Sequence, residues 1–375
     1  MNKNFILPDF DNSILNVSAT LAEFLGCDNK NTTLQILKTE LQKNYKNVIC
    51  ICFDGLGIHP IKLNLLPDDF LRKNIKHTIK STFPSTTTCA TTTINTNKYP
   101  LEHGWLGWSV YFENMDKVVE VFLDTDAWTG EKYDISQKPI ETPEFYFDKA
   151  KTDYKINTVF PKYVKVKNHD NNNVYETPEQ FFDFLKNICN RKEKQFCYAY
   201  YPEPDHTMHE YGASSTQAKE LIQDISKNIE NLYKNTKDTL FIIFADHGHA
   251  DVEGDIEIYK DKEIMDMLEI YPYLDGRAVA FKVKQDYKTI FPKIFEQKYG
   301  KDFEIFESKR LIDMGFFGKN GNKHHILGDY IAIGTYTHKQ MLLTPRSELF
   351  KSHHTSLTEE MEVPLILIPN WKEKT

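Results

Sequence analysis

Short runs of β-branched and aromatic residues recur along the chain, separated by longer segments with the hydrophobic spacing of helices. Five runs have the length and composition of buried strands: residues 48–53, 196–201, 239–245, 330–334 and 363–368. Three segments are expected to form helices: residues 178–190, 215–235 and 287–298. Strands that alternate with helices in this way predict an α/β fold, with a mostly parallel central sheet and helices on both faces.

Two regions depart from this alternation. Residues 105–122 have the pattern of two strands joined near Asn114, which predicts a hairpin beside the main sheet. Residues 255–325 have no readable period and are interpreted as a sub-domain or an insertion over the functional site. Because no internal repeat or Gly/Pro/Ser-rich linker divides the 375 residues, we expect one domain over residues 1–375, with a small additional β-rich or α+β portion.

Composition and charge exclude several classes of protein. Hydrophobic residues make up 40% of the chain and charged residues 27%, which is typical of a globular protein with a full core. The net charge of -8, with no long Lys/Arg run, argues against a nucleic-acid polymer as partner. Pro8, Asp9 and Asp11 interrupt the only apolar run near the N-terminus, so neither a signal peptide nor a membrane partner is expected. The six cysteines are interpreted as buried free thiols, which favours a cytoplasmic location.

Acidic and imidazole side chains follow several of the predicted strands. Asp54 ends the first run, and Asp246 and His247 follow the third. Because ligands bind outside the carboxyl ends of the strands in open α/β sheets, this placement is informative. Asp205 and His209 are four residues apart, a spacing that lets both side chains hold one cation from one face of a helical turn.

A segment rich in threonine supplies the candidate nucleophile. Pro84 is disfavoured in the middle of a helix, so a helix is expected to begin just after it, with the hydroxyl of Thr87 in its first turn. The N-terminus of a helix binds phosphate well, because its backbone N–H groups are free and its dipole is positive there.

Each of these segments, taken alone, also has an ordinary structural interpretation. Asp54 would cap the next turn, and the threonines would cap a helix. The set as a whole indicates a catalytic metal site, since it combines three carboxylates, at least three histidines and a hydroxyl. Such ligands suit zinc, and suit manganese or iron less exclusively.

Taken in order, the segments resemble the alkaline phosphatase superfamily, and within it the nucleotide pyrophosphatase/phosphodiesterase branch. The resemblance extends from residue 48 to residue 368. It is carried by Phe83-Pro84-Ser85-Thr86-Thr87, Tyr99-Pro100-Leu101-Glu102-His103-Gly104, Glu203-Pro204-Asp205 with His209, Asp246-His247-Gly248, and His354 followed by Glu360-Met361-Glu362-Val363-Pro364.

The resemblance implies two divalent metal ions, with zinc expected at both sites. One site would use Asp205, His209 and His354, with His353 as the rival of His354. The other would use Asp54, Asp246 and His247, with Thr87 as a further ligand and as the nucleophile. His206 and His249 are interpreted as supporting or bystander residues.

The chain departs from the family pattern at two positions. Thr88 follows the nucleophile where many relatives have an aromatic residue that stacks on a nucleotide base, and Trp108 stands where an Asn often contacts the phosphate. Both departures put a preference for nucleotides in doubt. Trp105, Trp108 or Tyr211 are the alternative stacking platforms.

The function implied by the resemblance is hydrolysis of phosphodiester or pyrophosphate bonds through a phosphothreonine on Thr87. The expected ligand is a small-molecule phosphate ester or diester. A phosphomonoesterase or a phosphonate hydrolase of the same superfamily is the alternative interpretation. From another class, a non-catalytic metal-binding scaffold stays open.

Overall fold

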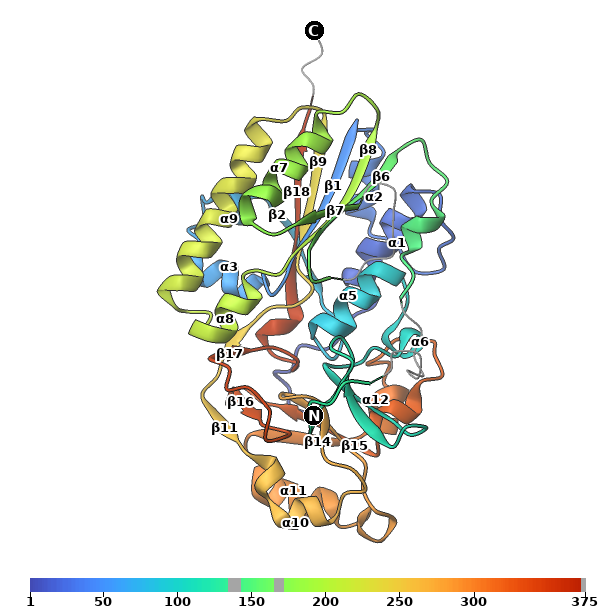
Figure 1. Ribbon diagram of the computed structural model, residues 1–375, viewed down its shortest axis with the longest axis vertical. Coiled ribbons are helices and arrows are strands. Elements are labelled where there is room, and N and C mark those ends of the chain that lie inside the picture. The colour runs from blue at the N-terminus through green and yellow to red at the C-terminus, as the bar shows by residue number, and fades with distance from the viewer. Residues whose placement is uncertain (134–142, 165–171, 372–375) are drawn as a thin grey trace.

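A seven-stranded sheet forms the upper part of the computed structural model, which describes residues 1–133, 143–164 and 172–371 (Figure 1). The strand order is β2-β18-β9-β1-β8-β6-β7. Its strands are β1 (Asn47–Phe53), β2 (Ile75–Lys80), β6 (Lys155–Pro161), β7 (Asn172–Tyr175), β8 (Gln195–Tyr201), β9 (Thr239–Phe244) and β18 (Glu362–Asn370). The pairings from β9 to β7 are parallel, and β18 runs antiparallel to both of its neighbours. The prediction of a mostly parallel central sheet is confirmed.

The central strands are apolar along their whole length because both of their faces are covered. Every residue of β1, β8 and β9 is buried. Continuous apolar runs are characteristic of parallel strands between two layers of helices. Strands with one face exposed to solvent instead alternate between apolar and polar residues. The four predicted runs that belong to this sheet agree with the observed strands to within two residues at each end.

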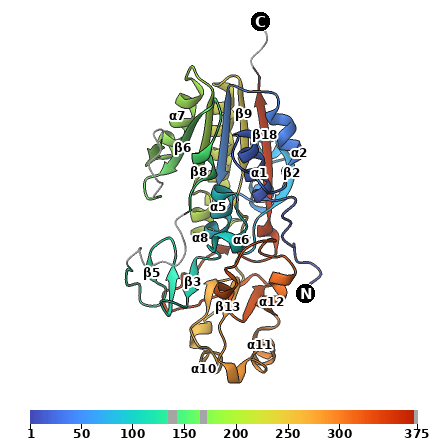
Figure 2. The same cartoon turned by 90° about the vertical axis from the view of Figure 1, so that its right-hand side faces the viewer.

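Helices cover this sheet on both faces. Figures 1 and 2 place α7 (Pro178–Cys189) and α9 (Thr216–Lys234) on one face, with α1 (Ile14–Phe24) and α2 (Gln35–Leu41) on the other. The other helices of this part are α3 (Ile58–Asn64), α4 (Phe70–Lys73), α5 (Thr87–Thr96), α6 (Pro100–His103) and α8 (Asp205–Tyr211). The Thr177 side chain accepts the backbone N–H of Gln180, which explains why α7 begins where the sequence predicts.

A second seven-stranded sheet, entirely antiparallel, forms the lower part of the molecule in Figure 1. Its order is β14-β15-β13-β12-β3-β4-β5. The strands are β3 (Ser109–Phe112), β4 (Lys117–Glu120), β5 (Thr125–Asp126), β12 (Tyr273–Asp275), β13 (Ala278–Phe281), β14 (Phe303–Glu307) and β15 (Tyr330–Gly334). The predicted hairpin of residues 105–122 is present as β3 and β4, at one side of this sheet.

The structure corrects the assignment of residues 330–334 to the central sheet. They form β15, between β14 and β13 of the second sheet. Ile331 and Ile333 pack into one apolar cluster and Tyr330 and Ala332 into another, so both faces of the strand are buried. A strand covered on both faces has the same apolar pattern in either sheet, which is why the pattern could not place it.

Residues 255–325 supply three of the seven strands of the second sheet, β12, β13 and β14, together with helices beside them. They include α10 (Lys262–Asp266), α11 (Phe291–Tyr299) and α12 (Ser308–Asp313), and Figure 1 shows α10 and α11 at the lower end of the molecule. The predicted start of the helix at residue 287 was wrong, because Pro292 lies in the first turn of α11 and residues 285–287 form a separate 3-10 turn. The division of the chain into domains stays a prediction.

The junction of the two sheets is where the predicted functional residues lie. Figure 1 shows α5, α8 and β17 (Ser352–His353) between the upper and the lower sheet. Short two-stranded ladders add to this region: β10 (Ala250–Asp251) pairs with β17, and β11 (Gly254–Ile256) pairs with β16 (Lys339–Met341). All six cysteines are free as expected; five of them are buried, and Cys27 is half-buried. Within the described ranges, no helix has the length and apolar character to span a membrane.

Candidate metal centre

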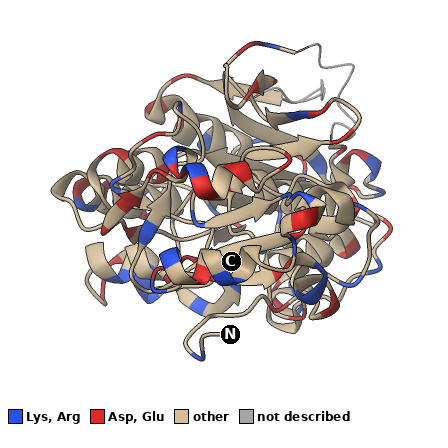
Figure 3. Ribbon diagram, turned by 90° about the horizontal axis from the view of Figure 1, so that it is seen from below, with Lys and Arg blue, Asp and Glu red and all other residues tan. Residues whose placement is uncertain are grey.

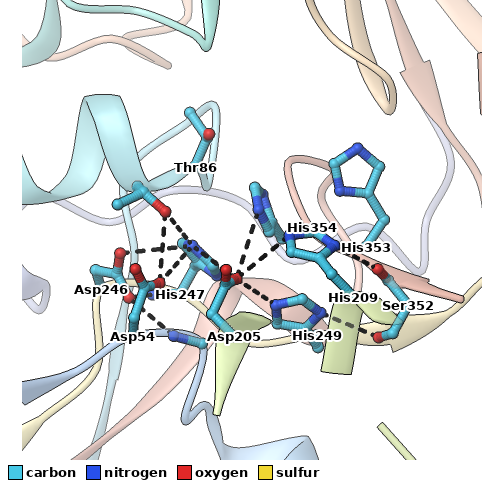
Figure 4. A network of polar contacts seen from close by, with 12 residues as sticks. Asp54, Thr86, Asp205, His209, Asp246, His247, His249, Ser352, His353 and His354 are labelled. Atoms are coloured by element: carbon cyan, nitrogen blue, oxygen red, sulfur yellow. Dashed lines mark hydrogen bonds and ion pairs between the residues drawn. The ribbon is translucent and has the colours of Figure 1, made fainter. Parts of the chain in front are cut away.

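Three carboxylates meet at the carboxyl ends of adjacent parallel strands (Figure 4). Asp54 directly follows β1, Asp246 lies two residues after β9, and Asp205 is the first residue of α8, four residues after β8. The backbone N–H of Asp205 donates to the Asp54 carbonyl at 3.2 Å, so the two segments stay together beyond the strand ends. Because β1 pairs with both β8 and β9, the three side chains converge on one place.

The hydroxyl of Thr87 faces this group from the start of α5. Thr87 is the first residue of the helix, and Thr86 is its N-cap. Thr87 Oγ1 lies 3.1 Å from His247 Nε2 and 3.4 Å from Asp54 Oδ1. The unpaired N–H groups of a helix N-terminus and its positive dipole end lie beside the same hydroxyl, where a phosphate would be stabilised.

Asp54, Asp246 and His247 form the first of two ligand groups, with one candidate ligand atom from each side chain within 4.8 Å of the others. Each carboxylate has one oxygen held by the protein. The Tyr200 hydroxyl donates to Asp54 Oδ2, and the backbone N–H groups of Gly55 and His247 donate to Asp246 Oδ1. Among the described residues, Asp246 Oδ2 is buried and accepts no hydrogen bond, although His247 Nε2 lies 3.5 Å away. A buried carboxylate oxygen without a donor is costly, so this group fits a cation.

The second group consists of Asp205, His209, His249 and His354, again with ligand atoms within 4.8 Å of one another. Asp205 Oδ1 lies at its centre, 3.4 Å from His209 Nε2, 2.6 Å from His249 Nε2 and 3.8 Å from His354 Nε2. The His209 side chain reaches Asp205 across one turn of α8, the i,i+4 spacing that the sequence predicts. Its Nδ1 donates to the Ser352 carbonyl at 2.8 Å, which turns Nε2 towards Asp205.

The electrostatics of the first group indicate that its carboxylates require a positive charge among them. Burial and the neighbouring Asp246 and Asp205 raise the pKa of Asp54 well above its usual value. Burial alone would lower the pKa of His247, but Asp246 and Asp54 outweigh it and raise this pKa to about 10. A proton on His247 thus takes the place of a cation among the carboxylates.

The second group has the opposite balance. Burial lowers the pKa of His209 to about 3 and the pKa of His354 well below its usual value. Burial would raise the pKa of Asp205, yet the neighbouring imidazoles of His209 and His249 hold it below its usual range. The imidazoles are therefore neutral at pH 7, the form in which histidine binds a metal.

His353 and His354, the rival candidate ligands, have different neighbours in the structure. His353 Nε2 lies 3.2 Å from Asp275 Oδ1, and Thr86 donates to the other Asp275 oxygen at 3.0 Å. The His354 ring instead lies against the His247 ring, with centroids 3.9 Å apart and planes tilted by 35°, and His354 belongs to the second group. His206 lines the adjacent cavity but is in neither group.

A cavity of about 570 Å³ opens beside Thr87 and the second group. Of the three predicted stacking platforms, only Trp108 lines it, and 39% of this residue is exposed. Trp105 is 7% exposed and packs against Phe122, and Tyr211 lies outside the cavity lining. The other residues that line the cavity come largely from residues 340–350. Glu120, Leu123 and Ala127, near β3 and β4, also line it.

Sequence reasoning missed three residues of the centre, Tyr200, Asp275 and Ser352, and interpreted His249 only as a supporting or bystander residue. For His249 a signal existed, because it lies two residues after His247, and in extended backbone such residues share one side. Tyr200, Asp275 and Ser352 act through contacts with residues far away in the sequence, which no local pattern reports.

Comparisons with known proteins agree with this architecture. Murine ectonucleotide pyrophosphatase/phosphodiesterase 5 is similar over 85% of this chain and 87% of its own, with a TM-score of 0.59 and 16% identity. Phosphonoacetate hydrolase from Sinorhizobium meliloti 1021, in complex with phosphonoformate, is similar over 87% of this chain and 90% of its own, with a TM-score of 0.59 and 13% identity. At such low identity these likenesses support the fold alone, and they confirm the predicted fold class.

Sequence comparison reaches the same group of proteins. Venom phosphodiesterase CdcPDE from Crotalus durissus collilineatus is 23% identical over 248 residues, which are 62% of this chain and 27% of the venom protein, so the chain spans about a quarter of that relative. The family model for type I phosphodiesterase/nucleotide pyrophosphatase matches residues 48–327, a range that contains Asp54, Thr87, Asp205 and Asp246 but ends before His354. The chain belongs to the type I phosphodiesterase/nucleotide pyrophosphatase family.

Proposed function

We propose that this protein hydrolyses phosphodiester or pyrophosphate bonds of small molecules, with Thr87 as nucleophile and two divalent metal ions, zinc by preference. The observation that carries the proposal is the position of Thr87 Oγ1, at the N-terminus of α5 and 3.1 Å from His247 Nε2 in a group of carboxylates and imidazoles. Phosphodiesterase relatives and an inactive threonine-to-alanine variant of the murine enzyme in complex with AMP support it.

The residues of the two groups have distinct roles in this proposal. Asp54, Asp246 and His247 hold one ion beside Thr87, and Asp205, His209 and His354 hold the other. Bound metal ions would supply the positive charge that favours the alkoxide of a hydroxyl and stabilises the charge on the phosphoryl oxygens. Asp54 is kept in place by Tyr200, and Asp246 by two backbone N–H groups.

The reaction proceeds in two displacements at phosphorus. Thr87 Oγ1 loses its proton to solvent and forms a bond to phosphorus, and the alcohol or phosphate arm leaves with its oxygen. Backbone N–H groups at the start of α5 stabilise a non-bridging oxygen. Water then breaks the bond between phosphorus and Thr87 Oγ1, which releases a phosphate monoester and restores the hydroxyl.

The charge of the cavity favours a diester over a monoester. Among the described residues that line it, Arg346 is the only Lys or Arg, against the carboxylates of Glu120, Glu210, Asp275 and Glu348 besides the proposed metal ligand Asp205. The Arg346 guanidinium donates to Glu120 at 3.3 Å and to the carbonyl of Asp126 at 3.0 Å, so its charge is already partnered. A monoester dianion would meet these carboxylates with one more negative charge than a diester.

Polyanionic polymers fit the surface poorly as well. Figure 3 shows Lys and Arg interspersed with Asp and Glu on the side that it views, and the net charge is -8. Trp108 and Leu349, which are both partly exposed, line the cavity and would contact an apolar or aromatic ester arm. The proposed substrate is therefore a small diester with at least one apolar or aromatic arm.

The experiment is hydrolysis of bis-p-nitrophenyl phosphate and of p-nitrophenyl phosphate by the zinc-loaded protein. We expect faster cleavage of the diester, and a loss of at least about 10³-fold in kcat for Thr87→Ala. Thr87→Ser keeps a hydroxyl and should keep a measurable part of the activity. Both variants should melt within a few degrees of the parent protein, which shows that the fold is intact.

The other outcomes have defined meanings. A preference for the monoester would make the protein a phosphomonoesterase. Turnover of phosphonoacetate in place of both esters would make it a phosphonate hydrolase. Full activity in Thr87→Ala would refute the nucleophile, and no turnover of any substrate by the protein with both metals bound would favour a non-catalytic metal-binding scaffold.

A further inference from the structure

His249 is the imidazole that lies nearest to Asp205 in the second ligand group. The side chain is fully buried, and its Nε2 lies 2.6 Å from Asp205 Oδ1. Its ring centroid lies 4.7 Å from that of His209 and 5.3 Å from that of His354 (Figure 4). Three imidazoles therefore surround one carboxylate oxygen.

The hydrogen bonds of Ser352 determine which nitrogen of His249 faces this oxygen. The Ser352 hydroxyl donates its only proton to the Ala250 carbonyl, at 2.9 Å. It must therefore accept from His249 Nδ1, which lies 3.0 Å away. The Nε2 lone pair of neutral His249 then points at a carboxylate oxygen 2.6 Å away, two acceptors that only a proton or a metal ion can join.

Ser352 orients a second imidazole in the same way. Its backbone carbonyl accepts Nδ1–H of His209, and its hydroxyl accepts Nδ1–H of His249. Both rings therefore direct Nε2 at Asp205. Metal-binding histidines are usually fixed by such a hydrogen bond on the other ring nitrogen.

The backbone of Gly55 leaves the space that the His249 ring occupies. A Cβ atom at Gly55 would lie 2.9 Å from His249 Cδ2, closer than Cβ atoms normally come to other atoms, and 3.0 Å from His249 Nε2. The ring is thus enclosed on one side by Gly55 and held on the other by Ser352. An imidazole fixed on both sides is a preorganised ligand.

We propose that His249 is a fourth protein ligand of the metal ion at Asp205, completing a set with His209 and His354. The inference rests on the proposed function only in requiring a metal at Asp205. Zinc in structural sites has four protein ligands, and catalytic zinc keeps an open position. Four protein ligands would hold an ion at Asp205 more tightly than the three side chains of Asp54, Asp246 and His247 hold theirs, and a substrate oxygen would have to add as a fifth ligand.

The test compares metal binding in His249→Ala, Ser352→Ala and His206→Ala with the parent protein. Metal per chain is measured by mass spectrometry, affinity by competition with a chromophoric chelator, and coordination by the visible spectrum of the Co²⁺-loaded protein. Ser352→Ala removes the acceptor of His249 but keeps the backbone carbonyl for His209. His206→Ala removes an imidazole next to Asp205 that is in neither group.

The parent protein should bind two ions, one of them more tightly. We expect His249→Ala to weaken the tighter site by more than about 100-fold and Ser352→Ala to weaken it by about 10- to 100-fold. Both should change the Co²⁺ spectrum of that site, and His206→Ala should change neither property. If His249→Ala fails to fold, as judged by circular dichroism, Ser352→Ala carries the test.

Affinities within about threefold of the parent, with a superimposable Co²⁺ spectrum, would show that His249 only packs against Asp205. That result would leave the proposed function intact. Conversely, a protein that loses the tighter ion on loss of His249 but hydrolyses no phosphate ester would support the ligand and contradict the proposed function.

Discussion

At the scale of single residues, the centre depends on the hydrogen bonds that orient each candidate ligand. Tyr200 holds one oxygen of Asp54, and two backbone N–H groups hold one oxygen of Asp246. The remaining oxygens face the place where a cation would lie. Such contacts orient a ligand before the metal arrives, so their loss affects metal binding although the ligand itself remains.

Tyr200→Phe should lower metal affinity at the Asp54 site and kcat/KM by about 10- to 100-fold, because Asp54 Oδ2 loses the hydroxyl that holds it. The matched control is Tyr198→Phe. Tyr198 lies two residues away on the same face of β8, and its buried hydroxyl has no hydrogen-bond partner in the described structure. Its removal should leave both quantities unchanged, and equal effects of the two variants would contradict the role of Tyr200.

Gly55→Ala should destabilise the protein by more than backbone strain alone explains. Gly55 has φ +72, and a side chain there would also collide with His249. Gly315 has φ +80, and among the described residues other than its chain neighbours no atom lies within 4 Å of the position that a Cβ would take there. Gly315→Ala therefore measures the strain by itself, about 1–2 kcal/mol. Urea unfolding of both variants gives the difference, and equal losses of stability would argue against a filled space beside Gly55.

At the scale of elements, the position of the candidate nucleophile Thr87 depends on the contacts that fix α5. His103 Nδ1 accepts the backbone N–H of Trp105 at 3.0 Å, so Nε2 carries the proton and donates to Thr93 in α5, also at 3.0 Å. His103 is buried, and burial lowers its pKa to about 3. A second ring proton would be directed at the Trp105 N–H, which opposes protonation of the folded chain.

This coupling predicts a loss of stability in acid. The unfolded chain takes up a proton on His103 below about pH 6.5, whereas the folded chain resists until about pH 3. The free energy of unfolding should therefore fall as the pH drops below 6.5, by about 2 kcal/mol at pH 5 from this residue. In urea unfolding, the stability advantage of the parent over His103→Gln should shrink by that amount between pH 7 and pH 5. Parallel pH profiles would contradict the assignment.

At the scale of the whole molecule, the ligands come from segments that lie between residue 54 and residue 354. Parallel strands of the upper sheet supply the carboxylates, and the segment after β17 supplies His354. Metal ions bound there would join these segments across the junction between the two sheets. Because the unfolded chain does not keep the ligands together, metal binding stabilises the fold.

Removal of metal should therefore lower the melting temperature. At free metal about 100 times the dissociation constant, a single site contributes about 2.7 kcal/mol to the free energy of unfolding. Calorimetry with and without a chelator measures this contribution, and Asp205→Asn should show a smaller difference than the parent protein. Identical melting with and without chelator in the parent would argue against a resident metal.

Much of the fold is encoded in local patterns. Continuous apolar runs identify β1, β8 and β9 because strands covered on both faces exclude polar side chains. The candidate nucleophile and the pair of Asp205 and His209 are also local signals, one from a helix start and the other from helical spacing. These features follow from the chemistry of residues that are neighbours in sequence.

Only the tertiary structure shows the features that depend on residues far apart in the sequence. Only strand pairing places β15 in the second sheet, because the same apolar run fits either one. Only the position of Asp275 shows that His353 and His354 have different partners. Only the hydrogen bond to Ser352 shows that His249 directs Nε2 at Asp205. In each case the sequence determined which groups are present, and long-range packing determined which atom of each group faces the metal centre.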